Sequence, residues 1–281
     1  MPNFTYRLVN VFTLDGARLS GNPLCVFENA RGLDDATMQA LALQFNLSET
    51  TFILPSDEAT VAVRIFTPAF EMPFAGHPTL GTAHVVRALG QSGDSVTLAM
   101  RAGVIPVTAD GDRWTLAANA PRYRAVDASP PQLAAMLGLA ADEVLAGARW
   151  VDTGAEQLVI PVRSPAAVSR CRPVAPLLAQ HARVTETNYM AYAFADTGSE
   201  VRARFFFSKH DVVTEDPATG SACANLAGWL LGRGTALPLG RVVRQGDEVG
   251  HPSRLVLRVD ADRRIFVSGE VIELGRGVVT L

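Results

Sequence analysis

The sequence is short of several residue types that particular functions require. Its 281 residues include three cysteines, Cys25, Cys171 and Cys223, whose spacing forms neither a metal template nor a disulfide framework. Lysine occurs only as Lys209, so a Schiff-base mechanism would depend on that single amine. The few thiols, and an N-terminus without the pattern of a signal peptide, predict a cytoplasmic location.

Long apolar runs and an excess of positive charge are also lacking. No stretch of about 18 apolar residues occurs, so neither a membrane span nor a membrane partner is expected. The formal net charge is -3, and without a basic surplus to neutralise phosphates nucleic acid is not expected as a partner. The motifs of zinc proteases, calcium loops, P-loops and dinucleotide-binding folds are absent, so no metal and no cofactor is predicted.

What the chain has in quantity is apolar sequence divided into short segments. Apolar residues make up 48% and charged residues 19%, which suffices for well-filled cores. Alternating or β-branched runs bounded by turn residues predict many strands. Helical patterns are fewer and cover residues 34–45, 78–89, 131–137 and 217–232. This balance favours an α+β fold over a regular alternation of strand and helix.

The sequence also repeats itself. Residues 64–66 (Arg-Ile-Phe) lead into HPTLGTA at 77–83, and residues 204–206 (Arg-Phe-Phe) lead into DPATGSA at 216–222. Upstream, residues 48–52 have a looser acidic counterpart at residues 185–189. We interpret this pattern as two copies of one domain, joined near residues 118–124.

The two heptapeptides predict a site at a pair of helix starts. Each follows a strand and places a proline, Pro78 or Pro217, at the first helical position, where backbone N–H groups and the helix dipole attract carboxylate or phosphate. His77 and Asp216 occupy the same position of the aligned motifs and could act as acid and base or orient a substrate. The alternative is ordinary helix initiation with Asp216 as N-cap.

Glu49 is the candidate proton carrier. It lies in NLSETTF, after the predicted helix 34–45 and before an apolar strand, and Ser48 could cap or position it. A carboxylate beside a dry cleft has a pKa raised towards working pH, where it can take and return a proton. The alternative is a solvated carboxylate. A two-thiol racemase is disfavoured, because the loops 75–81 and 215–220 lack cysteine and both Cys25 and Cys223 are predicted to be buried.

Five sequence blocks together resemble the PhzF family of phenazine biosynthesis. The blocks are GNPLCVF (21–27), NLSETTF (46–52), FAGHPTLGTA (74–83), EDPATGSACANLAGWL (215–230) and QGDEVGHPS (245–253). The resemblance implies two pseudo-symmetric domains like those of diaminopimelate epimerase, each a curved, mostly antiparallel sheet or barrel around a central helix, with the active site between them. It implies that a strand at 269–281 completes the N-terminal domain of residues 1–118, that residues 119–268 form the second domain, and that the protein is a homodimer.

The resemblance also implies a reaction. The chain is similar to a cofactor-independent isomerase of trans-2,3-dihydro-3-hydroxyanthranilate, in which the residue at the position of Glu49 moves a proton on a small carboxylic acid. Residues at the positions of His77 and Asp216 hold or protonate the substrate in that family. The family residues that line the site and bind the substrate carboxylate match Ser48, Gly76, Gly220 and Ser221. His251 stands where the family often has arginine, which changes the contact made there.

Two alternatives remain open at the level of sequence. One is a racemase or epimerase of a small amino or hydroxy acid, which product stereochemistry would distinguish from a proton shift along the substrate. The other is a catalytically silent protein that binds a small acid, which would bind tightly without exchanging substrate hydrogen with solvent.

Overall fold

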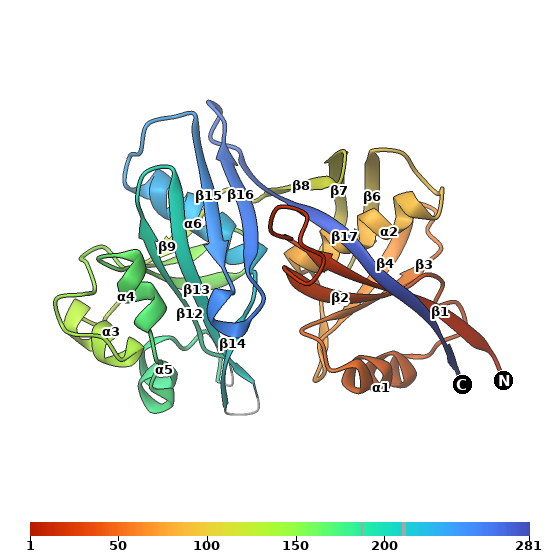
Figure 1. Cartoon of the computed structure of the whole chain (residues 1–281), viewed down its shortest axis with the longest axis horizontal. Coiled ribbons are helices and arrows are strands. Elements are labelled where there is room, and N and C mark those ends of the chain that lie inside the picture. Colours follow the sequence, from red (N-terminus) through yellow and green to blue (C-terminus); the bar gives the residue numbers. More distant parts are fainter. Residues whose placement is uncertain (187, 210–211) are drawn as a thin grey trace. The chain divides into compact units, whose positions relative to one another are not determined.

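The computed structural model describes residues 1–186, 188–209 and 212–281 of the chain (Figure 1). These residues form two compact units. Unit 1 comprises residues 1–117 and 268–281, and unit 2 comprises residues 118–267. The last strand of the chain therefore belongs to the same unit as the first.

Unit 1, all of whose residues are described, is a closed barrel of eight strands. The strands are β1 (Asn3–Val11), β2 (Asn22–Phe27), β3 (Thr50–Leu54), β4 (Val61–Phe66), β6 (Ser95–Met100), β7 (Gly103–Asp110), β8 (Arg113–Ala118) and β17 (Ile265–Thr280). Neighbours pair in the order β1, β2, β3, β4, β6, β7 and β8. Strand β17 pairs with both β8 and β1, which removes the open sheet edges.

Two helices of unit 1 serve as crossovers between parallel strands. Helix α1 (Asp35–Phe45) connects β2 with β3 and is capped by Asp34, whose side chain accepts the Thr37 N–H at 2.8 Å. Helix α2 (Gly76–Ala88) follows β5 (Glu71–Met72) and leads to β6, which runs parallel to β4. A parallel pair needs such a crossover because a tight turn cannot join its strands.

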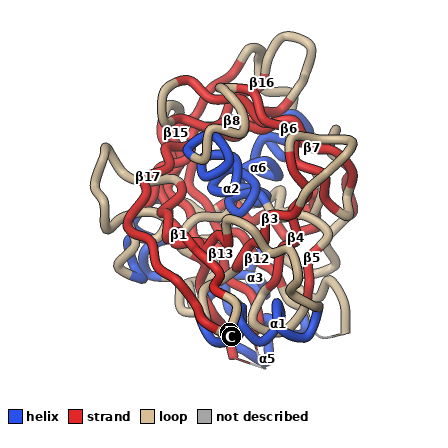
Figure 2. The backbone as a smooth tube through the Cα atoms, turned by 90° about the vertical axis from the view of Figure 1, so that its right-hand side faces the viewer, coloured by secondary structure: helices blue, strands red, loops and turns tan. Residues whose placement is uncertain are grey.

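Helix α2 packs against the barrel strands around it, as the tube in Figure 2 shows. Nearly every residue of its first three turns is buried, including the polar His77, Thr79 and Thr82, as expected of a helix that is surrounded by strands. Gly81 permits the close approach, because a Cβ atom there would lie 2.6 Å from Leu24 Cδ2 and 2.9 Å from Val11 Cγ2. A small residue at this position thus determines how near the helix lies to β1 and β2.

Unit 2 repeats this topology. Its strands are β9 (Arg122–Arg124), β10 (Arg149–Asp152), β11 (Glu156–Pro161), β12 (Met190–Asp196), β13 (Glu200–Lys209), β14 (Val212–Asp216), β15 (Leu239–Gln245) and β16 (Ser253–Val259). Strands β11 and β12 are parallel, as are β13 and β15, and helix α6 (Gly220–Gly232) is the crossover in the second pair. The predicted α+β fold with two pseudo-symmetric domains, each a sheet around a central helix, is confirmed.

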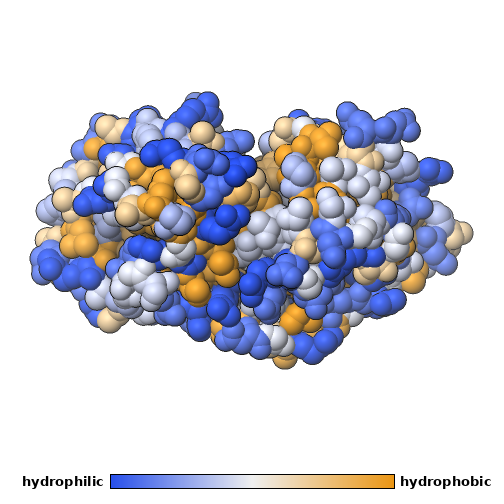
Figure 3. Space-filling view, turned by 90° about the horizontal axis from the view of Figure 1, so that it is seen from above, coloured by the Kyte–Doolittle hydropathy of each residue, from blue (hydrophilic) through white to orange (hydrophobic). Residues whose placement is uncertain are grey.

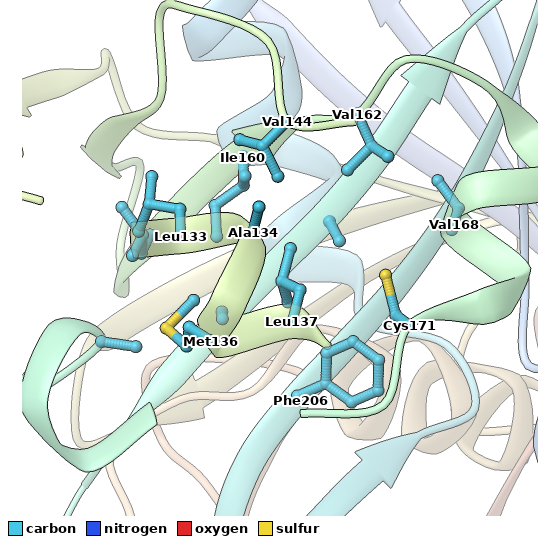
Figure 4. Packing of buried hydrophobic residues seen from close by; sticks show 14 of the residues in the cluster. Leu133, Ala134, Met136, Leu137, Val144, Ile160, Val162, Val168, Cys171 and Phe206 are labelled. Atoms are coloured by element: carbon cyan, nitrogen blue, oxygen red, sulfur yellow. The ribbon is translucent and has the colours of Figure 1, made fainter. Parts of the chain in front are cut away.

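Unit 2 also carries helices that the sequence patterns did not all predict. Helix α3 (Pro130–Leu137) matches the expected segment, whereas α4 (Pro165–Arg170) and α5 (Ala175–His181) were not predicted. Both are too short to show a helical period of apolar residues. Together with the sheet they enclose a core that includes Leu137, Cys171 and Phe206 (Figure 4).

The predicted helix starts at Pro78 and Pro217 are wrong. Helix α2 begins earlier, at Gly76, and α6 begins later, at Gly220. The delay in α6 has a tertiary cause, because Gln245 Nε2 donates to the Asp216 carbonyl at 2.8 Å and to Thr219 Oγ1 at 3.0 Å. This side chain keeps residues 217–219 in an irregular turn after β14.

The repeat is real, but its alignment differs from the predicted one. In β4 and β5, Phe66 pairs with Glu71, whereas in β13 and β14 Phe206 pairs with Glu215, so the second hairpin is longer. In each half an arginine two residues before the phenylalanine binds that glutamate through two nitrogens and lies over the phenylalanine ring. The matching motifs are therefore EMPFAG at 71–76 and EDPATG at 215–220.

The corrected alignment changes two equivalences. Asp216 matches Met72, and His77 matches Ser221, so the interpretation that His77 and Asp216 share a motif position is wrong. The acidic pairing also fails. Thr187 of that segment lies outside the described residues, while Glu186 is exposed and precedes β12 by several residues.

Within the described ranges, no helix is both long enough and apolar enough to cross a membrane. The face drawn in Figure 3 mixes hydrophilic and hydrophobic residues. Exposed large apolar side chains are scattered through the sequence, as at Leu19, Phe70 and Val212. Such single exposed residues are normal and need no partner.

Candidate functional site

Glu49 lies in unit 1 between α1 and β3. Helix α1 ends at Phe45 and is followed by its C-cap Asn46, whose left-handed backbone (φ 51°) turns the chain towards the sheet. Glu49 then directly precedes Thr50, which pairs with Cys25 of β2. Its side chain is 15% exposed, so the carboxylate is largely enclosed rather than solvated.

His77, the second residue of α2, faces this carboxylate. His77 Nε2 lies 3.6 Å from Glu49 Oε2, and the imidazole is 5% exposed. Burial lowers the pKa of His77 to about 3, although a hydrogen bond with the backbone of Pro23 raises it. The ring is therefore neutral at physiological pH, and the two residues form a carboxylate–imidazole pair rather than an ion pair.

His77 Nε2 is the ring nitrogen that faces Glu49. Pro23 has no N–H, so its backbone accepts a hydrogen bond from the ring through its carbonyl oxygen. Within the described part of the chain His77 Nε2 has no hydrogen-bond partner. A neutral imidazole has a proton on one nitrogen and a lone pair on the other, so Nε2 can donate to or accept from Glu49 or a substrate hydroxyl, according to the tautomer.

Asn22 is a neighbour of this pair that the sequence reasoning did not single out. Its amide Nδ2 lies 3.4 Å from His77 Nδ1, and the residue is fully buried. It follows Gly21, whose positive φ of 84° and close approach to the Val11 carbonyl permit the turn into β2. The only sequence signal for Asn22 was its place in the GNPLCVF block.

Asp216 is the last residue of β14 in unit 2. The Thr219 hydroxyl donates to its Oδ2, and Gln245 holds both residues, so the loop of residues 216–219 is fixed from two sides. Gly246 (φ 84°) lies against the Pro217 carbonyl, 2.5 Å from where a Cβ would be. The block at 245–253, which joins β15 and β16, thus buttresses the loop that carries Asp216.

His251 lies within that buttress. Its carbonyl accepts the Ser253 hydroxyl at 2.9 Å and packs against Gly246, while its N–H donates to the Gly246 carbonyl at 3.0 Å. The backbone of His251 therefore stabilises the turn. This contribution does not depend on whether the side chain is histidine or arginine.

The remaining predicted binding residues lie beside these groups in sequence and in their own units. Ser48 precedes Glu49, and Gly76 is the first residue of α2, next to His77. Gly220 and Ser221 are the first two residues of α6 in unit 2, and Ser221 accepts a hydrogen bond of 2.9 Å from Gln157 Nε2. Unit 1 therefore holds Ser48, Glu49, Gly76 and His77, and unit 2 holds Asp216, Gly220 and Ser221.

The burial predicted for Cys25 and Cys223 is confirmed. Cys25, Cys171 and Cys223 are all buried and free, and burial raises the pKa of each thiol. Buried thiols with raised pKa values are poor nucleophiles and poor bases at neutral pH. In the described ranges no group of three or more His, Cys, Asp or Glu side chains is arranged to hold a metal ion.

Comparison with known proteins identifies the family of the chain. The family model described as phenazine biosynthesis-like protein (PhzC-PhzF) matches residues 9–277. The chain belongs to this family. An uncharacterized isomerase of Pasteurella multocida is 38% identical, over 98% of this chain and 93% of its own length. The trans-2,3-dihydro-3-hydroxyanthranilate isomerase of Pseudomonas chlororaphis is 34% identical, over 98% of this chain and 99% of its own. Such relatives make this member of the family an isomerase.

Solved structures show the same fold. A PhzF-family protein of Bacillus anthracis matches with a TM-score of 0.87 and 23% identity over the full length of both chains. A hydroxyproline epimerase of Agrobacterium vitis matches with a TM-score of 0.65 and 12% identity, over 99% of this chain and 93% of its own. At these identities the likeness concerns the fold alone, and it extends from PhzF proteins to amino-acid epimerases.

Proposed function

We propose that this PhzF-family isomerase shifts a proton along a small carboxylate-bearing substrate without a cofactor, with Glu49 as the acid/base. The observation that carries the proposal is the enclosed pair of Glu49 and His77, with 3.6 Å between Oε2 and Nε2 and a neutral imidazole. A carboxylate in dry surroundings is suited to general acid/base catalysis on carbon acids.

The proposed reaction balances within the substrate. Glu49 removes a proton from carbon, and the electron pair of that C–H bond forms a new double bond while the neighbouring double bond shifts. Protonated Glu49, beside the neutral ring of His77, then returns the proton at a different carbon. The product is an isomer of the substrate, so no oxidant or reductant takes part.

The groups of unit 2 enter the proposal through the family resemblance. Asp216 would hold a polar group of the substrate, and the first turn of α6, with Gly220 and Ser221, would bind its carboxylate through backbone N–H groups and a hydroxyl. Ser48 and Gly76 would line the site in unit 1. A cytoplasmic location and a homodimeric state belong to the same proposal, and light scattering of the purified protein tests the second.

The substrate of the Pseudomonas chlororaphis relative, trans-2,3-dihydro-3-hydroxyanthranilate, is the first compound to test. We expect proton NMR in deuterated water to show its isomerisation by the wild type, with deuterium at the new C–H position to the extent that protonated Glu49 exchanges with solvent before it returns the proton. Glu49→Gln keeps the shape of the side chain but cannot carry the proton, so its rate should fall by at least about a hundredfold. Exposed Glu186→Gln, the matched control, should retain the wild-type rate.

Other outcomes of this experiment contradict the proposal in recognisable ways. Near-normal turnover by Glu49→Gln would remove Glu49 from its role. Deuterium incorporated at a single carbon with inverted configuration would identify an epimerase or racemase instead. Tight binding without any hydrogen exchange, on this compound and on other small carboxylic acids, would indicate a silent binding protein.

A further inference from the structure

A buried polar chain in unit 2 leads from the sheet to the first turn of α6. Asn225 Nδ2 donates to Gln157 Oε1 at 2.7 Å, and Gln157 Nε2 donates to Ser221 Oγ at 2.9 Å. Asn225 is completely buried and Gln157 is 2% exposed, whereas Ser221 is partly exposed. The polar chain therefore ends at its partly exposed member.

The direction of these hydrogen bonds is fixed by the backbone. Asn225 Oδ1 accepts the Thr153 N–H at 2.9 Å, and Asn225 Nδ2 also donates to the Ala155 carbonyl at 2.8 Å. Because a backbone N–H can only donate and a carbonyl can only accept, the Asn225 amide cannot be reversed. Gln157 must then accept from Asn225 and present its own NH₂ group to Ser221.

This polarity determines what Ser221 can offer a ligand. A serine hydroxyl has one proton to donate and lone pairs with which to accept. Within the described part of the chain, the side chain of Ser221 has only the hydrogen bond that it accepts from Gln157. Its proton is therefore left for an acceptor outside the network, such as a carboxylate oxygen.

Unit 1 shows that the fold does not require this polar chain. The sixth residue of each central helix is Gly81 in α2 and Asn225 in α6. Leu24 lies one residue before the part of β2 that pairs with β3, and Gln157 lies one residue before the part of β11 that pairs with β12. In unit 1 Leu24 packs on Gly81. In unit 1, apolar packing thus fills this position without burying a polar group. In unit 2, two amides are buried there, which costs desolvation free energy.

We propose that Gln157, held by Asn225, is a positioning residue that fixes the Ser221 hydroxyl as a hydrogen-bond donor to the substrate carboxylate. The inference rests on the proposed function for the identity of the ligand as a carboxylate. It assigns to the two amides a role that the apolar contact in unit 1 cannot fill.

The test is a double-mutant cycle on binding of anthranilate, a small aromatic carboxylate, measured by titration calorimetry. Gln157→Glu preserves the side-chain shape, and its carboxylate can still accept a hydrogen bond from Asn225. The carboxylate also accepts from Ser221, so the Ser221 hydroxyl donates to residue 157 instead of to the ligand. We expect Gln157→Glu and Ser221→Ala each to weaken binding about tenfold. The double variant should bind no more weakly than Ser221→Ala alone, because both changes remove the same donor.

The cycle separates positioning from simple charge repulsion. A repulsive effect of the new carboxylate would persist without the hydroxyl, so a double variant weaker by the product of the single effects would overturn the proposal. Wild-type affinity in Gln157→Glu, or no anthranilate binding by the wild type at millimolar concentration, would overturn it as well.

A second variant covers the case in which a buried glutamate prevents folding. Gln157→Leu copies Leu24 of unit 1 and frees the hydroxyl to rotate, so binding should weaken about threefold with Ser221 present and not at all in Ser221→Ala. Unchanged affinity with Ser221 present would overturn the proposal.

Turnover of trans-2,3-dihydro-3-hydroxyanthranilate separates failure of this proposal from failure of the proposed function. A non-additive binding cycle without isomerisation supports positioning and rejects that isomerase activity. Isomerisation with an additive cycle keeps the activity and rejects positioning. Where both hold, Gln157→Leu should raise KM about threefold and leave kcat nearly unchanged.

Discussion

At the scale of single residues, the site depends on a histidine that is kept neutral by burial. His77 has an ordinary pKa of 6.5 and a pKa of about 3 in the folded protein, because desolvation disfavours its charged form. Motif reasoning selected both His77 and Glu49, but motif alone gave no protonation state. Burial of the ring determines that state, and with it a neutral neighbour for Glu49.

The lowered pKa of His77 predicts a loss of stability on acidification. Below pH 6.5 the unfolded chain binds a proton at this ring and the folded chain does not, until the pH reaches the folded pKa of about 3. The free energy of unfolding should therefore fall by about 1.4 kcal/mol per pH unit over this window from His77 alone. Above pH 6.5 this contribution to stability is fully present.

Denaturant unfolding of the wild type and His77→Gln between pH 8 and pH 4.5 measures this contribution. The difference in unfolding free energy between the two proteins should be constant above about pH 7 and should then change by about 1.4 kcal/mol per unit in favour of the variant. Parallel profiles across the whole range would show that His77 takes up its proton at the same pH in the folded and the unfolded chain.

At the scale of elements, the packing of α2 depends on a glycine. Gly81→Ala should destabilise the protein by about 1–3 kcal/mol, because the new Cβ would clash with Leu24 and Val11. The gain in helix propensity, about 1 kcal/mol, is too small to offset that clash. Thermal and urea unfolding give the comparison.

Gly93→Ala is the matched control for this helix variant. Gly93 has an unstrained φ, and no atom lies within 4 Å of where its Cβ would be, so the unfolding free energy should change by less than about 0.5 kcal/mol. If Gly81→Ala proved as stable as the control, α2 would have room to move away from β1 and β2.

Sequence patterns located the elements better than their ends. The helix at 34–45 was predicted closely because its start is signalled by the local N-cap Asp34. The start of α6 was misplaced because Gln245, distant in sequence, holds the Asp216 carbonyl and Thr219. Local propensity carries no information about such a contact.

At the scale of the whole molecule, the C-terminal strand closes the barrel in which the chain began. Residues Gly275 to Thr280 of β17 pair with Leu8 to Asn3 of β1, and the Leu281 N–H donates to the Pro2 carbonyl at 3.1 Å. Unit 1 therefore cannot complete its hydrogen bonding until the last residues of the chain are in place.

Deletion of residues 275–281 should weaken unit 1 selectively. We expect amide hydrogen exchange to show faster exchange throughout β1 and its neighbour β2, while β12 and β13 of unit 2 keep their protection, because they pair within unit 2. Removal of Leu281 alone, beyond the strand, is the control and should have a small effect. Equal loss of protection in both units would show that they unfold together.

Local pattern and the order of motifs were enough to predict the abundance of strands and the repeat, and to select Glu49 and His77 as candidates. Tertiary packing was needed for the 3.6 Å approach of those two side chains, the alignment of the repeat and the polar chain from Asn225 through Gln157 to Ser221. Each of these joins residues far apart in the sequence. Burial and hydrogen-bond geometry at such contacts exist only once the sheets and their central helices have packed.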